Sequence, residues 1–500
     1  MKKNSRPNII IFMMDTQGAR NMGCYGYYRP TTPNIDLLAR EGAVFLNHFV
    51  TGPWTLPTHA SLFSGRYESG HGAGAQHEVL EPGIPMMGEI FGRAGYHTAA
   101  FCNNIWAYDP EPGGTSWGFK DYIRYNDLEA VEPFVPSDNP DERDKGALKA
   151  VGLMLQWIDR HRARRAEQPF LIFVNSVEPH DVYRPPEPFR SRFLPPGVQY
   201  DPDVHAPHGL QARVTVGEFT PPLDFWFIQR ALYDASTATL DDRIGLFTRE
   251  LRQRGILDDT IFIVTGDHGD TIGEHPGHCY HNQNGVWDTI MKTPLVVRYP
   301  RLIKPGARCK NLTQIVDVLP TLMDICGVED PAARQSIQGE NFVTALKKPV
   351  RDFALLEAQR SIHPIRRAWS ETANPEEIDV RFMNVWYKAA RTQRHKYVWV
   401  SNGQDMLFDI VKDPDERWNV IDRHPEIARK LQQAMERKLM SMEQRYYMDA
   451  MRPEHRAYSR RNPYQVRRMA AWGFYQPGVV PPWDPRELER WLKEGGAKKK

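Results

Sequence analysis

The 500-residue sequence has few cysteines, almost no net charge and no long apolar run. Its five cysteines are widely spaced and form no Cys-x-x-Cys pair, which argues against a disulfide framework or a structural zinc cluster. The 64 Lys and Arg against 62 Asp and Glu leave a net charge of +2, which argues against a general nucleic-acid surface. No apolar stretch approaches the roughly 20 residues that cross a bilayer, so we expect no membrane segment.

The N-terminal segment is better explained as a strand than as a signal peptide. Residues 9–14 are apolar, but Asp15 interrupts them and no small-residue cleavage site follows. We therefore expect a soluble, cytoplasmic protein.

The first two thirds of the chain have the pattern of an α/β fold. Short apolar runs at 9–14, 98–102, 170–175, 261–265 and 295–298 predict strands. Amphipathic stretches at 147–162 and 231–254 predict covering helices. The strand candidates are almost continuously apolar, which is typical of strands buried on both faces of a mostly parallel sheet between helical layers.

The character of the sequence changes near residue 350. Short strand patterns at 387–391, 396–400 and 405–410, with Asn402-Gly403 as a turn signal, predict a small antiparallel sheet. Residues 426–445 predict a helix, and a basic, aromatic tail follows. We therefore expect a catalytic domain at 1–350, an antiparallel subdomain at 351–425 and a helical extension at 426–500.

The tail has two interpretations. It packs on the body or on a sister subunit, giving a homo-oligomer, or it binds nucleic acid or an anionic membrane through stacked aromatics and arginines. The near-neutral net charge favours the first, so we expect neither a nucleic-acid nor a membrane partner.

Polar residues follow two of the expected strands. Asp15 ends the first apolar run, and Asp267-His268 come after 261–265. Ligands gather beyond the carboxyl ends of parallel strands, where two carboxylates and an imidazole suit a cation of the Mn²⁺ or Zn²⁺ type. A strand-end Asp alone is more often a turn former.

Thr55 lies where the sequence predicts the start of a helix. Pro57 suits the first turn of a helix, which places Thr55 near unpaired amides and the positive end of the helix dipole. A hydroxyl there is helped toward the alkoxide, although a capping Thr is the ordinary explanation.

Several short motifs occur in a shared order from about Arg6 to about Val420. They begin with Asp15-Thr16, Gly23-Cys24-Tyr25-Gly26 and Arg29-Pro30-Thr31-Thr32-Pro33-Asn34, and continue with Pro179-His180-Asp181-Val182-Tyr183, Gly266-Asp267-His268-Gly269, Gly273-Glu274-His275, Val316-Asp317-Val318-Leu319-Pro320-Thr321 and Asp413-Pro414-Asp415-Glu416. This series resembles the sulfatase family of the alkaline phosphatase superfamily. The resemblance implies a large mixed sheet between helical layers and a small C-terminal antiparallel subdomain.

The resemblance also implies site roles. It places the nucleophile at Thr55, which also contacts the metal, the metal ligands at Asp15, Asp267 and His268, and the leaving-group acid at His180. One divalent metal ion is implied, with Mn²⁺ or Zn²⁺ favoured over Ca²⁺ or Mg²⁺. Further candidates for substrate binding are Asn104, Lys292, His275, His278 and His281, and the three histidines are also candidates for a second metal.

The sequence departs from the usual sulfatase pattern in its nucleophile. Sulfatases have Cys or Ser there, which is converted to formylglycine, whereas the methyl group of Thr55 prevents oxidation to an aldehyde. His59 stands where the family has Arg, and we expect it to orient Thr55 or to contact the ester.

These departures favour a small-molecule phosphomonoester or phosphodiester as substrate. The alternatives are a sulfuric ester hydrolase without formylglycine, a phospho-group transferase and a non-catalytic binding homologue.

Overall fold

The computed structural model describes residues 6–75, 80, 83–104, 106–107, 114–125, 144–205, 210–215, 217–275, 278–281, 285–359 and 384–444. The predicted basic and aromatic tail, and with it the expected oligomer contact, lies outside the described residues.

The main sheet has eight strands in the order β4-β3-β5-β1-β6-β7-β2-β8. Its strands are β1 (Asn8–Asp15), β2 (Ala43–Phe49), β3 (His97–Cys102), β4 (Asp121–Arg124), β5 (Phe170–Pro179), β6 (Thr260–Gly266), β7 (Leu295–Arg298) and β8 (Ala307–Gln314). The pairing is parallel except along β7, which runs antiparallel to both β6 and β2. The predicted mostly parallel, mixed sheet is therefore confirmed.

The two faces of the sheet build two separate cores. Successive side chains of a strand point to opposite faces. In β1, Ile9, Ile11 and Met13 accordingly join one apolar cluster, and Ile10, Phe12 and Met14 join the other. The strand is thus buried on both sides, as its continuous apolar run predicted.

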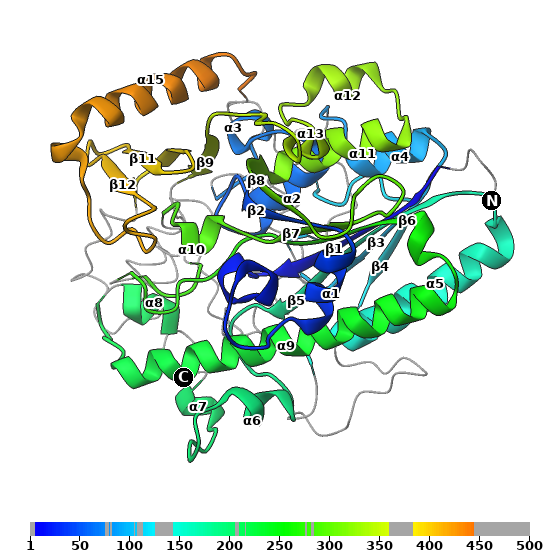
Figure 1. Ribbon diagram of the computed structural model, residues 1–500, viewed down its shortest axis with the longest axis horizontal. Helices are drawn as coiled ribbons and strands as arrows, with labels where there is room; N and C mark the ends of the chain where they lie inside the picture. The colour runs from blue at the N-terminus through cyan, green and yellow to red at the C-terminus, as the bar shows by residue number, and fades with distance from the viewer. Residues whose placement is uncertain are drawn as a thin grey trace, which may run out of the picture.

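Helices cover both faces (Figure 1). One layer contains α2 (Thr55–Ser64), α4 (Met87–Arg93) and α11 (Val318–Cys326), and the other contains α1 (Pro33–Glu41), α5 (Ala147–Arg165) and α9 (Leu223–Gln253). The shorter helices are α3 (Glu68–His71), α6 (Phe189–Phe193), α7 (Pro202–His205), α8 (Leu210–Thr215), α10 (Asp288–Met291), α12 (Pro331–Ser336) and α13 (Phe342–Ala345). The helix predicted at 231–254 begins eight residues earlier, because Leu223 to Arg230 extend the same helix beyond the buried stretch.

A second sheet has the antiparallel order β12-β11-β10-β9, with β9 (Ala354–Ala358), β10 (Tyr387–Arg391), β11 (His395–Val400) and β12 (Met406–Asp409). Helix α15 (Pro425–Met440) packs on it and ends five residues before the predicted end. The small C-terminal antiparallel sheet is confirmed, whereas the domain boundaries at 350 and 425 stay predictions.

Buried charges join the second sheet to the main body. Asp288 of α10 contacts Lys396 of β11 at 3.0 Å and Arg391 of β10 at 2.9 Å, and Lys396 also contacts Glu416 at 2.7 Å. Because α10 directly follows the loop after β6, these ion pairs hold the second sheet against the edge where β1 and β6 end. Over the described ranges, no helix combines the length and the apolar character that crossing a membrane requires.

Candidate active site

The carboxyl ends of β1 and β6 bring the predicted metal ligands together. The two strands are parallel neighbours with Met14 opposite Gly266, so Asp15 and Asp267 leave the sheet side by side. His268 Nε2 lies 3.7 Å from Asp15 Oδ1 and 3.6 Å from Asp267 Oδ2. All three side chains are fully buried, and their donor atoms are close enough to share one metal ion.

The loop after β1 is fixed by the main chain and by α9. Thr16 has a positive φ of 65°, and its amide donates to Asp267 Oδ1 at 2.8 Å. The Tyr233 hydroxyl of α9 donates to the Thr16 carbonyl at 2.7 Å and accepts from the Gly18 amide at 3.0 Å. These contacts orient Asp267 before any ligand arrives.

Thr55 is the first residue of α2 and is 3% exposed. Asn104, just beyond β3, donates from Nδ2 to Asp15 Oδ2 and lies 3.4 Å from the Thr55 hydroxyl. The Thr55 side chain also interacts with the Asp267 carboxylate and favours its ionised form. The candidate nucleophile therefore lies at the helix N-terminus beside two of the candidate metal ligands.

Burial controls ionisation at this site. It raises the pKa of Asp15 to about 6, with the nearby Asp267 carboxylate adding to the rise, and raises the pKa of Asp267 to about 7. It lowers the pKa of His268 to about 4, so the imidazole is neutral at pH 7. His268 Nε2 is buried with no hydrogen-bond partner among the described residues.

This donor set fits a divalent cation. Two buried carboxylates repel each other, and a neutral imidazole nitrogen that no described residue hydrogen-bonds faces them at 3.6 and 3.7 Å. Two oxygens and one nitrogen are ligands that Mn²⁺ and Zn²⁺ accept. Asp15, Asp267 and His268 would hold the ion, with the Thr55 hydroxyl beside them.

His180 lies at the same edge of the sheet, one residue beyond β5. Its Nδ1 donates to the Asp181 carbonyl at 2.5 Å and is 3.0 Å from Asp181 Oδ1. Burial lowers the pKa of His180, and the charges of Asp181 and Asp15 oppose that shift. The predicted leaving-group acid therefore lies within electrostatic reach of the Asp15 carboxylate.

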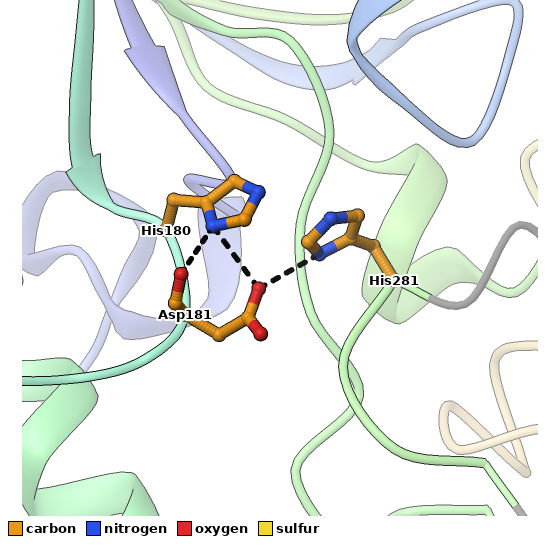
Figure 2. Close-up of side chains that lie close together, drawn as sticks. All are labelled: His180, Asp181 and His281. Carbon is orange, nitrogen blue, oxygen red and sulfur yellow. Dashed lines mark hydrogen bonds and ion pairs between the residues drawn. The ribbon is translucent and has the colours of Figure 1, made fainter. Parts of the chain in front are cut away.

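His281 approaches from the loop after β6, as Figure 2 shows. Its ring centroid is 4.6 Å from that of His180 and 4.4 Å from that of His268. Its Nδ1 is 2.7 Å from Asp270 Oδ1, and the other oxygen of Asp270 accepts from the Tyr183 hydroxyl. Burial raises the pKa of Asp270 to about 8.

Three charged residues at this edge were not predicted as site residues. Asp181 lies within a quoted motif and Asp270 directly follows another, each three residues or fewer from predicted site residues, so their positions were the available signal. Lys145 carries no motif signal. Its ammonium donates to the His180 carbonyl, and burial lowers its pKa while Glu178, Asp181 and Asp15 oppose the shift.

His59 lies within α2, one turn after Thr55, and contacts the nucleophile through the main chain. Its Nδ1 is 2.8 Å from the Thr55 carbonyl, and its Nε2 is 3.3 Å from Asn175 Nδ2. The ring also packs edge-on against Phe173. Burial lowers the pKa of His59 to about 4, so the ring is neutral at pH 7 and suited to orienting Thr55.

The other predicted substrate-binding residues lie toward the second sheet. Burial lowers the pKa of Lys292, opposed by Asp288, while Arg391 and Arg20 lower it further. His275 stacks on Trp287 with ring centroids 4.2 Å apart, and His278 meets the same ring edge-on at 5.5 Å. Their contribution to substrate binding stays a prediction.

Comparison with known proteins agrees with this geometry. The family model described as Sulfatase matches residues 7–328, and the model described as N-sulphoglucosamine sulphohydrolase, C-terminal, matches residues 273–445. The chain belongs to the sulfatase family. Members of this family depend on a metal ion, and the matching members are hydrolases of sulfuric or phosphoric esters, which confirms the predicted enzyme class.

Two relatives and one solved structure illustrate these similarities. The chain is 24% identical to an ulvan-active sulfatase of Formosa agariphila over 84% of this chain and 78% of the relative. It is 28% identical to the uncharacterized sulfatase YidJ of Escherichia coli over 91% and 89%. The phosphonate monoester hydrolase of Agrobacterium radiobacter has the same fold, with a TM-score of 0.67, 21% identity and coverage of 87% and 96%.

Proposed function

We propose that this sulfatase-family chain hydrolyses phosphate monoesters or diesters with the unmodified Thr55 hydroxyl as nucleophile. The observation that supports it most is the Thr55 side chain at the start of α2, in contact with Asp267 and 3.4 Å from Asn104. The helix dipole and the unpaired amides at this position favour negative charge on the attacking oxygen and on the ester.

The divalent ion would be held by Asp15, Asp267 and His268. When bound, such an ion lowers the pKa of an adjacent hydroxyl and offsets the negative charge of ester oxygens. The donor set favours Mn²⁺ or Zn²⁺, since an imidazole replaces one oxygen ligand of an all-oxygen site.

Three side chains of the protein carry out the bond-forming and proton-transfer steps. Asp267 accepts the hydroxyl proton while the Thr55 oxygen forms a bond to phosphorus and the ester P–O bond breaks. His180 gives a proton to the departing alcohol oxygen. Water then attacks phosphorus and displaces the Thr55 oxygen: Asp267 returns its proton to that oxygen, and the attacking water gives one proton to His180.

The nucleophile is the reason to favour phosphate over sulfate. A formylglycine hydrate releases sulfate by breaking its own C–O bond, and that route is closed to Thr55. A phosphorylated Thr is opened by attack of water at phosphorus. The second candidate is a sulfuric ester hydrolase, which the similarity to sulfatase relatives favours.

The test compares nitrophenyl phosphate, bis-nitrophenyl phosphate and nitrophenyl sulfate with Mn²⁺ or Zn²⁺ supplied. We expect cleavage of a phosphate ester, and a loss on the order of a thousandfold or more in kcat for Thr55→Ala. Thr55→Ser is the matched control, because it keeps the hydroxyl and should keep most of the activity. Acid quenching during turnover should trap phosphate on Thr55, which peptide mass spectrometry detects.

Three results would contradict the proposal. Full cleavage by Thr55→Ala would make water the direct nucleophile. A preference for the sulfate ester would support the second candidate. Loss of activity in Thr55→Ala without trapped phosphate in the wild type would argue against a phosphothreonine.

A further inference from the structure

A second cluster of metal-binding side chains lies beside the first site. His180, Asp181 and His281 offer one donor atom each, and all three atoms lie within 4.8 Å of one another. His180 and Asp181 come from the loop after β5 and His281 from the loop after β6, and Figure 2 shows their side chains turned toward one another. None of the three belongs to the Asp15, Asp267 and His268 group.

The distances between the donor atoms of these side chains are close to those around a bound zinc ion. Asp181 Oδ1 is 3.0 Å from His180 Nδ1 and 3.8 Å from His281 Nδ1. A tetrahedral zinc ion with bonds of about 2.1 Å places its ligand atoms roughly 3.4 Å apart. The measured separations lie on either side of that value, so small side-chain rotations would close the site.

The burial and the charge of these three side chains also favour a bound cation. The side chains of His180, Asp181 and His281 are 6%, 8% and 11% exposed, so water contributes little to stabilising charge among them. Asp270, whose Oδ1 lies 2.7 Å from His281 Nδ1, brings a second carboxylate to the cluster. Lys145 offers one positive charge to these carboxylates and also interacts with Asp15.

We propose that His180, Asp181 and His281 bind a second divalent cation, of the Zn²⁺ or Mn²⁺ class, next to the Asp15, Asp267 and His268 site. Two imidazoles and one carboxylate are the ligands that zinc accepts most readily. Asp270, held in turn by the Tyr183 hydroxyl, contacts the same His281 nitrogen, so a cation there takes the place of its proton and has the Asp270 carboxylate within reach as a further ligand.

The second site has a consequence for His180 that rests on the proposed function. A cation on His180 Nδ1 replaces the proton that this nitrogen now directs toward Asp181. The neutral ring then carries its proton on Nε2. His180 is thereby kept in the tautomer that donates from Nε2 to a leaving group.

The test counts metal ions in the full chain, without reference to activity. A chelator removes bound metal from the protein, which is then dialysed against Zn²⁺. Inductively coupled plasma mass spectrometry measures the number of zinc ions per chain. We expect about two ions per chain for the wild type and about one for Asp181→Asn, for His281→Gln and for Asp15→Asn. His424→Gln is the control, because its side chain is 49% exposed beside Glu426 and lies outside all candidate metal groups of the described residues, and it should keep about two ions.

A separate experiment tests where the second metal ion binds. Crystals soaked in Zn²⁺ should give one anomalous peak between His180, Asp181 and His281, and His281→Gln should abolish that peak alone. A wild type that binds one ion at saturation, or a second ion that survives both Asp181→Asn and His281→Gln, would overturn the proposal. Since these readouts need no turnover, they stand whether or not the ester hydrolysis proposed above is found.

Discussion

At the residue scale, the ionisation of Asp15 and Asp267 determines how tightly the first site holds a cation. Burial raises their pKa values to about 6 and about 7, so both bind protons as the pH falls below neutrality. His268, with its pKa lowered to about 4, stays neutral over that range. A cation must displace the protons on the two carboxylates, so its affinity should fall steeply between about pH 8 and 5.

Titration calorimetry with Mn²⁺ checks this expectation. Runs at about pH 5.5 and 8, each in two buffers with different heats of ionisation, give the number of protons released. We expect proton release at the lower pH and little at the higher one. Equal affinity at both values would show that the carboxylates are already ionised without metal.

The same shifts predict the opposite trend for the stability of the metal-free protein. The folded-state pKa values of Asp15 and Asp267 lie above the unfolded value of 3.8, so the folded chain binds more protons between about pH 4 and 7. The contribution of these groups to stability therefore decreases as pH rises through that range. In chelator, the double variant Asp15→Asn, Asp267→Asn should lose this decrease, and thermal unfolding of variant and wild type measures it.

The sequence predicted the residues of the first site because motif and strand end coincide there. Asp15 and Asp267-His268 each end an apolar run, and the parallel pairing of β1 with β6 brings them together. The sequence predicted His281 as a candidate for substrate or metal binding, but the contact of His281 with Asp181 and that of Lys145 with His180 join residues that are distant in the chain. Their roles depend on loop geometry, which no local pattern of residues records.

At the element scale, the loop between β6 and α10 has no space for a side chain at Gly269. A Cβ there would lie 2.2 Å from the Thr289 carbonyl, and the Gly269 amide donates to the Ile290 carbonyl at 2.7 Å. Gly269→Ala should therefore displace Asp267 and His268, cost about 1–3 kcal/mol of stability and weaken metal binding. Gly92→Ala is the matched control.

Gly92 lies within α4, and apart from its chain neighbours and the backbone of its own helix a Cβ added there would meet no described atom within 4 Å, so Ala should raise stability by about 0.5–1 kcal/mol. Chemical unfolding and metal titration of both variants provide the measurements. Unchanged metal affinity in Gly269→Ala would mean that the loop adapts without moving the ligands.

Strand prediction succeeded for continuous, fully buried apolar runs and failed for the edge strands β4 and β8 and for β2 beside β8. β1 and β6 lie in the middle of the sheet and show as continuous apolar runs. In β8, at the edge of the sheet, the exposed residues Arg308 and Lys310 alternate with buried ones. The sequence of this strand therefore resembles that of a surface loop. The antiparallel direction of β7 could not be predicted either, because strand composition does not record which way a neighbour runs.

At the scale of the whole molecule, the buried ion pairs between α10 and the second sheet are the contact most sensitive to a single change. Lys396 is fully buried and contacts both Asp288 and Glu416, so Lys396→Met leaves two buried carboxylates without that partner. Removing one partner of a buried ion pair costs about 3–5 kcal/mol. We expect Lys396→Met to lower the stability of the protein by that amount and to reduce ester cleavage, because Asp288 lies on the helix that follows the metal loop.

Arg394→Met is the matched control in the same sheet. Its side chain is 57% exposed and pairs with Asp409 at 3.0 Å, and such surface pairs contribute at most about 1 kcal/mol. Chemical unfolding should therefore separate the two variants clearly, and metal content should fall only in Lys396→Met. If Lys396→Met unfolds the second sheet but leaves metal content and cleavage intact, the two sheets are coupled less tightly than their shared charges indicate, and the metal loop is ordered by Tyr233 and the main sheet alone.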